Sequence, residues 1–199
     1  YNSAAFTAII AWRVFGENLG LPKIIAVTMA LTGCVLVAGA YDPAAWRVNP
    51  LGLATGLLAG LAFAMYSIMG RAASRRSIPP WTTMLYIFGS AAVFLFLFQV
   101  LPPLLAPGIA APPFFHLGSS LPGWGVLIAL ALGPTVLGYG LFMVSLGYLP
   151  ASVANLIATL EPAFTSVLAF LFLGEVLTPI QIAGSVLILL GVMVLRLKS

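Results

Sequence analysis

The chain has 199 residues, of which 62% are hydrophobic and only 6% are charged. Soluble domains carry about 25% charged residues, so this composition excludes a water-soluble fold and indicates a membrane protein. The net charge of +4 comes from basic residues that form no patch suited to nucleic acid, and the single cysteine, Cys34, excludes a disulfide framework or a thiolate metal site.

Seven apolar runs are long enough, or nearly so, to span a bilayer, which takes about 20 residues. We predict transmembrane helices at residues 1–16, 22–41, 51–70, 81–101, 122–147, 150–173 and 179–196. The alternating pattern of an outer-membrane barrel is absent from the sequence. The fold class is therefore an all-α integral membrane bundle, with a linker at residues 42–50 and an extended proline-rich loop at residues 102–122.

The distribution of Lys and Arg predicts the orientation, because cytoplasmic loops carry an excess of both. When the loops are assigned alternately to two sides, one side has Arg47 alone. The other side collects Arg13, Lys23, Arg71, Arg75, Arg76, Arg196 and Lys198. We therefore expect a multi-pass protein of the inner cell membrane with a cytoplasmic C-terminus.

An internal repeat relates the two ends of the chain. Residues 3–37 align without gaps to residues 161–195, an offset of 158, with ten identities in 35 positions. The most specific matches are Phe6-Thr7 with Phe164-Thr165, and Gly16-Glu17 with Gly174-Glu175. The predicted topology places the two Gly-Glu pairs on opposite sides of the membrane, so the copies are antiparallel. Inverted repeats of this kind are a transporter architecture.

The repeat also predicts that this chain is N-terminally incomplete. The second unit begins near Leu51 and contains five predicted helices, whereas only two matching helices precede it. Applying the offset gives 51 − 158 = −107, so roughly 100 residues, enough for about three helices of about 20 residues each, are expected before Tyr1. The full protein is then expected to have ten helices, of which about seven lie in this chain.

The run GYLPASVANLIATLEPAFTSVLAFLFLGEVLTPIQIAGSVLILLGVMVLR, residues 147–196, resembles the last two helices of the EamA type in the drug/metabolite transporter superfamily. Residues 1–41 resemble the pair that closes the first repeat of that family, and residues 51–199 its complete second five-helix repeat. The resemblance implies a ten-helix secondary transporter built from two inverted units. Many members export amino acids or other metabolites.

Glu161 is the strongest candidate for a functional residue. It falls about ten residues into its predicted helix, roughly 15 Å from the start and near the bilayer midplane. A charge there costs about 2.5–3.5 kcal/mol on insertion scales, so it should face a partner or a water-filled cavity, or be protonated. Pro162 leaves the Ala158 carbonyl without its helical N–H, as a possible ligand for substrate or cation. The repeat aligns Glu161-Pro162 with Ser3-Ala4, so one copy lacks the pair; the alternative role is a structural carboxylate.

A polar stripe on the same predicted helix lies on a different face from Glu161. It contains Ser152, Asn155, Thr159 and Ser166. The stripe lines the pathway or makes interhelical hydrogen bonds, and the sequence leaves both open. Glu17 and Glu175 are expected to belong to tight turns, with Arg13 as a local partner of Glu17 four residues away.

A predicted helix break supplies the next candidates. Gly133-Pro134-Thr135 is expected to interrupt the helix at residues 122–147, and discontinuous helices mark binding sites in transporters. The predicted pathway or coupling residues are Glu161, Pro162, Asn155, Thr159, Tyr139, Thr135, Tyr66 and Ser67. No catalytic residue, metal ligand or cofactor site is predicted, because nucleotide loops and Cys/His clusters are missing from the sequence.

The leading hypothesis is a secondary-active exporter of amino acids or similar metabolites, working by alternating access through a central cavity. The expected partners are a small-molecule substrate, the lipid bilayer and a coupling proton, with no nucleic acid and with a monomeric full-length protein. An uncoupled facilitator and a multidrug cation/proton antiporter are the alternatives. A membrane enzyme is disfavoured by the lack of paired acids or a nucleophile–base set.

Overall fold

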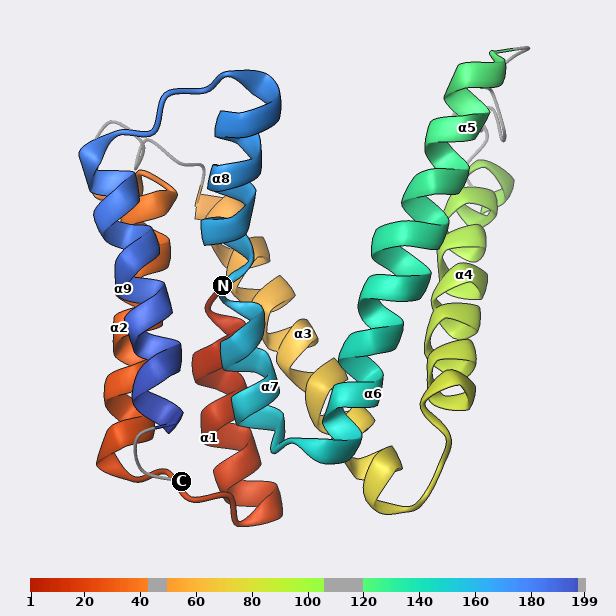
Figure 1. Cartoon of the computed structure of the whole chain (residues 1–199). Coiled ribbons are helices and arrows are strands. Elements are labelled where there is room, and N and C mark those ends of the chain that lie inside the picture. The colour runs from red at the N-terminus through yellow and green to blue at the C-terminus, as the bar shows by residue number, and fades with distance from the viewer. Residues whose placement is uncertain (43–49, 106–119, 197–199) are drawn as a thin grey trace. The chain divides into compact units, whose positions relative to one another are not determined.

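The computed structural model describes residues 1–42, 50–105 and 120–196. Almost all of the predicted linker, residues 42–50, and most of the proline-rich segment, residues 102–122, lie outside these ranges. The described residues form helices and turns, without a β-strand (Figure 1), which confirms the all-α fold class.

The helices follow the predicted runs closely. In chain order they are α1 (Ser3–Phe15), α2 (Leu21–Val37), α3 (Pro50–Arg75), α4 (Pro80–Leu105), α5 (Leu121–Leu130), the π-helix η2 (Ala131–Tyr139), α6 (Gly140–Tyr148), α7 (Ala151–Ala158), α8 (Glu161–Leu173) and α9 (Pro179–Arg196). In the described ranges, four helical stretches are long and apolar enough to cross a bilayer: Leu51–Arg75, Pro80–Leu101, Leu121–Tyr148 and Ala151–Leu173. Three shorter apolar helices, α1, α2 and α9, account for the other predicted runs.

Two boundaries differ from the predictions. Helix α3 continues through Arg75, beyond the predicted end at residue 70, and α4 continues through Leu105, beyond residue 101. The backbone therefore remains helical at the first residues of the segment that was predicted to be an extended loop.

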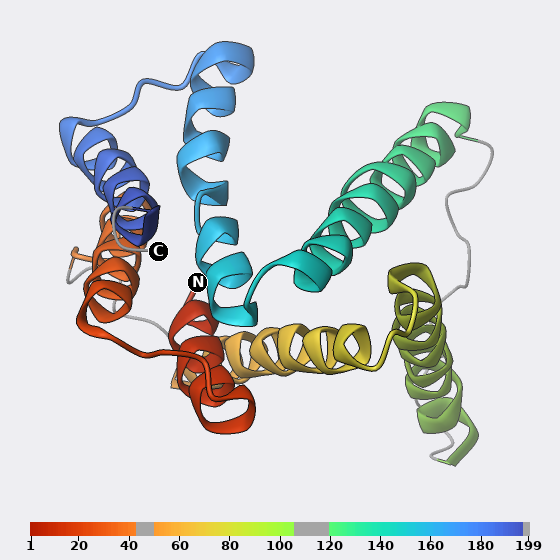
Figure 2. The same cartoon turned by 60° about the horizontal axis from the view of Figure 1, so that its bottom comes forward.

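The helices form two compact units. The first unit contains α1, α2, α3 as far as Arg71, and the three helices α7 to α9. The second unit, Ala72–Tyr148, contains the end of α3, then α4, α5, η2 and α6. Within the first unit α2 packs along α9 and α1 packs on α7, and within the second unit α6 packs on α4. Figure 2 shows α2 and α9 side by side again, from a second direction.

The predicted repeat has an equivalent in the first unit. Helices α1 and α8 both have 13 residues, and their bounds differ by the same offset of 158. Each ends at a glycine in the left-handed region, Gly16 (φ 67°, ψ 25°) and Gly174 (φ 68°, ψ 18°), where a side chain would be strained. The next N–H donates back into the helix at 3.3 Å for Glu17 and at 3.4 Å for Glu175. The two segments thus fold as copies of one element.

Helices α2 and α9 pack antiparallel through small residues. A Cβ on Gly33 would lie 2.6 Å from the Gly184 carbonyl oxygen, and a Cβ on Gly191 would lie 2.9 Å from that of Ala26. The offset of 158 maps Gly33 to Gly191 and Ala26 to Gly184, so the two contacts exchange with each other. This reciprocity is what a local two-fold axis through an inverted pair of helices requires.

A substitution at this contact should weaken the fold. Gly33→Ala places a Cβ against the backbone of α9, and overpacking of this kind costs about 1–3 kcal/mol. Thermal unfolding of the full-length protein in detergent should therefore begin at a lower temperature. Gly56→Ala is the matched control, because its Cβ would meet nothing within 4 Å and both changes improve helix propensity equally. Equal melting temperatures for the two variants would contradict the close contact.

Candidate functional site

The helix at residues 150–173 is discontinuous, and the break lies at Glu161-Pro162. Helix α7 ends at Ala158, a turn follows at residues 159–160, and α8 begins at Glu161. Pro162 has no N–H to offer the Ala158 carbonyl, four residues earlier, so a regular α-helix cannot continue there. The sequence predicted a kink within one helix. The structure has two half-helices, α7 and α8, that follow each other along the chain with a two-residue turn between them.

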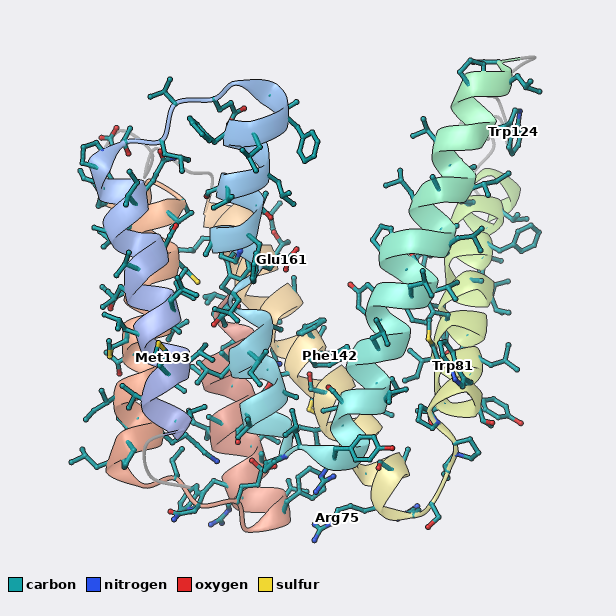
Figure 3. All side chains as sticks on the ribbon, in the orientation of Figure 1. Arg75, Trp81, Trp124, Phe142, Glu161 and Met193 are labelled. Carbon is teal, nitrogen blue, oxygen red and sulfur yellow. The ribbon has the colours of Figure 1, made fainter. Side chains whose placement is uncertain are left out.

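Glu161 occupies the first turn of α8 and is exposed (Figure 3). The positive end of the helix dipole lies at this position and favours a negative charge there. Pro162, in contrast, is buried within the same first turn. The break thus leaves the Glu161 carboxylate exposed in the first turn of α8.

The polar stripe of α7 faces the interior of the first unit. Asn155 is 1% exposed, and its amide donates to the hydroxyl oxygens of Thr7 in α1 (2.9 Å) and Ser67 in α3 (3.0 Å). Ser3 donates in turn to the Asn155 carbonyl oxygen at 3.2 Å. Thr159 is buried as well and donates to the Leu156 carbonyl oxygen at 2.6 Å. The structure therefore brings Asn155 and Ser67 together in a hydrogen-bonded cluster that also includes Ser3 and Thr7 and joins α1, α3 and α7. We call this cluster of four side chains the amide knot.

Tyr66 neighbours this knot on α3. It is half-buried, and its ring lies 5.7 Å from that of Phe63 between centroids. The candidates of the first unit thus fall into two groups. Asn155, Thr159 and Ser67 are buried among neighbouring helices, whereas Glu161 is exposed at the helix break.

Thr135 and Tyr139 lie in the second unit, on the π-helix η2. The sequence predicted a break at Pro134, but the helix is continuous and widens around this residue. Pro134 cannot donate to the Leu130 carbonyl, and the Thr135 hydroxyl donates to that oxygen instead, at 3.1 Å. Hydroxyl side chains commonly satisfy backbone groups that a proline frees inside a membrane helix. Tyr139 is 37% exposed and meets Phe88 of α4 edge to face, with ring centroids 5.5 Å apart.

The sequence did not reveal one cluster of charges in the first unit. Glu17, in the turn between α1 and α2, accepts hydrogen bonds from the N–H groups of Ala151 (2.8 Å) and Ser152 (3.3 Å) and from the Ser152 hydroxyl. Lys23 lies 3.6 Å from the same carboxylate and donates to the Ser152 hydroxyl oxygen at 2.8 Å. We call Glu17, Lys23 and Ser152 the Glu17 cluster. The predicted pairing with Arg13 is wrong, because Glu17 turns toward α7 while Arg13 is exposed.

No group of three or more His, Cys, Asp or Glu residues in the described ranges is arranged to hold a metal ion. The described part of the first unit offers the exposed carboxylates of Asp42, Glu161 and Glu175, the buried amide of Asn155 and the largely buried ion pair of Glu17 and Lys23. These groups suit reversible binding of a polar or charged molecule and the joining of mobile helices.

Removal of the central amide should destabilise the knot. Asn155→Ala leaves the buried hydroxyls of Thr7 and Ser67 without their donor, and an unsatisfied buried group costs about 1–3 kcal/mol. The thermal unfolding temperature of the full-length protein in detergent should fall. Thr55→Ala is the control, because that hydroxyl is exposed and bonds only to its own helix in the described structure. A variant as stable as wild type would show that the knot contributes little.

Comparison with known proteins adds an independent line of evidence. The chain is 32% identical over 190 residues to the uncharacterized transporter YwfM of Bacillus subtilis, covering 94% of this chain and 58% of the relative. It is 24% identical over 181 residues to an uncharacterized transporter of Archaeoglobus fulgidus, covering 91% of this chain and 59% of the relative. With the threonine/homoserine exporter RhtA of Escherichia coli K12 it shares 29% identity over 180 residues, covering 89% and 55%.

The chain therefore spans less than three fifths of the length of the curated relatives that it matches. No solved structure matches it. The EamA-like transporter family matches residues 50–197, which include α3 to α9. This match covers well over half of the chain, and the apolar helices and inverted packing agree with it. The chain is a membrane protein that belongs to the EamA-like transporter family, within the drug/metabolite transporter superfamily.

Proposed function

We propose that the full protein is a secondary-active exporter of amino acids or similar small metabolites, working by alternating access. The observation that carries this proposal is the helix break at Glu161-Pro162, which presents a carboxylate at the start of a half-helix. Broken helices near the bilayer midplane are where secondary transporters bind substrate and coupling ions. The name of one relative, a threonine/homoserine exporter at 29% identity, supports amino acids as the substrate class.

Glu161 binds the substrate ammonium in this proposal, or carries the coupling proton. It is the only acid within the predicted spans, because the other acids, Glu17, Asp42 and Glu175, lie in turns or at helix ends. A charged residue inside a membrane span is costly, and such residues are usually retained for transport or proton relay. Thr135 and Tyr139, and Tyr66 on α3, are proposed pathway residues, whereas Asn155, Thr159 and Ser67 support the helices that frame the pathway.

The membrane orientation is also part of the proposal. The turn between α1 and α2, the start of α7 and the end of α9 lie together at one end of the first unit, since all three line a common cavity. Arg13 and Lys23 belong to this end of the unit. An excess of basic residues marks the cytoplasmic side, so we assign this end and the C-terminus to the cytoplasm of an inner-membrane, multi-pass protein.

Loss of the Glu161 charge should abolish coupled transport without unfolding the protein. An uncharged amide cannot pair with an ammonium or exchange a proton, and a hydrogen bond to a charged group contributes about 1.5–3 kcal/mol. Glu161→Gln should therefore reduce amino-acid efflux from proteoliposomes of the full-length protein by about ten-fold or more.

Glu161→Asp is the matched variant, because it keeps the charge and shortens the side chain by one methylene. It should retain part of the activity, and both variants should unfold at temperatures close to wild type because Glu161 is exposed. Full transport by Glu161→Gln would refute the role of the carboxylate.

A pH gradient separates the proposed coupled exporter from an uncoupled facilitator. If efflux is exchanged for protons, an imposed gradient should accelerate wild-type transport against the amino-acid gradient, and Glu161→Gln should not respond. Transport that ignores the gradient would favour the facilitator. A panel that includes cationic drugs tests the multidrug antiporter, which would prefer those compounds to amino acids.

A further inference from the structure

The Glu17 cluster closes one end of the first unit by joining helices from opposite repeats. Helix α7 begins at Ala151, and its N-cap residue, Pro150, makes no side-chain capping hydrogen bond. The first N–H groups of a helix need an acceptor, and a carboxylate near them also favours the helix dipole. Glu17 supplies this acceptor from a position 134 residues away in the sequence. The distance from the Ala151 nitrogen to the Glu17 carboxylate oxygen is 2.8 Å.

Lys23 completes the cluster as the charged partner of Glu17. The side chains of Lys23 and Glu17 are only 14% and 10% exposed, so both charges are largely removed from water. Removing one member of a buried ion pair leaves the other uncompensated, which is costly. The Ser152 hydroxyl lies between the two charges, since it accepts from Lys23 and donates to Glu17. Glu17, Lys23 and Ser152 are therefore each bonded to the other two.

The helices that the cluster joins are packed through small side chains. Buried alanines line both of them, namely Ala4, Ala8 and Ala11 on α1 and Ala151 and Ala154 on α7. Small residues let the backbones of two helices approach each other closely. Half-helix α7 is largely buried in this packing, whereas in α8 only Pro162 and Ala163 are buried in the described structure. Glu161 thus lies at the junction between the largely buried half-helix α7 and the mostly exposed half-helix α8.

A cavity beside the cluster gives the turn between α1 and α2 room to move. Its volume is about 830 Å³, and it is bordered by Asn18 and Lys23 from the turn, Val153 and Ile157 from α7, and Met193 from α9. Because Lys23 borders both the cavity and the ion pair, its side chain has space to leave the carboxylate when α7 moves.

We propose that the Glu17 cluster is the gate at this end of the transport pathway. It holds α7 against α1 while the pathway is open on the side of α8, and it must release before substrate can pass on the side of α7. This inference rests on the proposed transport function. The repeat places Glu175 at the inverted position, at the opposite end, where the same turn geometry recurs.

Thiol accessibility of the full-length protein tests the gate without any transport assay. Ala154→Cys places a thiol on α7 where the native side chain is 4% exposed, in a background in which Cys34 and every other cysteine of the full-length protein are replaced by alanine. Glu17→Gln removes the charge that caps α7 and pairs with Lys23. The rate of maleimide labelling at position 154 should rise about ten-fold, as expected for losing one hydrogen-bonded charge.

Two further variants separate a gate from general loosening. Glu175→Gln makes the same chemical change at the inverted position and should leave the labelling rate unchanged or lower it. The exchange Glu17→Lys with Lys23→Glu restores an ion pair, but a lysine cannot accept from the N–H groups of α7, so labelling should stay fast.

Three results would overturn the proposal: unchanged labelling in Glu17→Gln, an equal rise in Glu175→Gln, or wild-type labelling after the charge exchange. Thermal unfolding of each variant checks that it is folded. If Glu17→Gln does not fold, Glu17→Asp takes its place, and because Glu17→Asp keeps the charge, its labelling rate should lie between those of wild type and a fully opened contact. Failure of the substrate proposal would appear as full transport by Glu161→Gln, which leaves this labelling readout intact.

Discussion

The backbone of a membrane-spanning segment must satisfy its own polar groups, and this constraint explains where the helices depart from regularity. Lipid offers no hydrogen bonds, so each freed carbonyl or N–H needs a partner within the protein. At Pro134 the partner is the adjacent Thr135 hydroxyl, and the helix widens but continues. At Pro162 the span instead divides into α7 and α8. Where the span itself begins, at Ala151, the first N–H groups of α7 are satisfied by a distant carboxylate, that of Glu17.

The inverted repeat explains why packing contacts and helix caps at one end of the first unit recur at its other end. Helices α2 and α9 meet around a local two-fold axis, since the contact of Gly33 with Gly184 exchanges with that of Gly191 with Ala26. Helices α1 and α8 share bounds, caps and turn geometry under the same offset. Two copies of one element, packed in opposite directions, can adopt each other's conformations, which is the physical basis of alternating access.

The sequence predicted the helices because hydropathy and glycine placement are local signals. The seven apolar runs and the offset of 158 correspond to helices with nearly the predicted bounds. The partner of Glu17 could not be predicted, because Arg13 lies one helical turn away and the true contact spans 134 residues. The stripe of Asn155 was compatible with both a pathway and a packing surface, and only the positions of α1 and α3 place it among hydrogen-bonded neighbours. Local patterns identify which residues are unusual, whereas tertiary packing decides their partners.

The asymmetry between the copies is concentrated in one residue pair. Ser3, the equivalent of Glu161, is buried and donates to Asn155, so the first copy uses this position to fix helices together. In the second copy the same position carries an exposed carboxylate at the start of α8. The turn glycines Gly16 and Gly174, by contrast, recur in both copies. The carboxylate therefore fits a role that the transporter needs once, at the meeting point of the two half-helices, while the repeated turn glutamates fit roles needed at both ends.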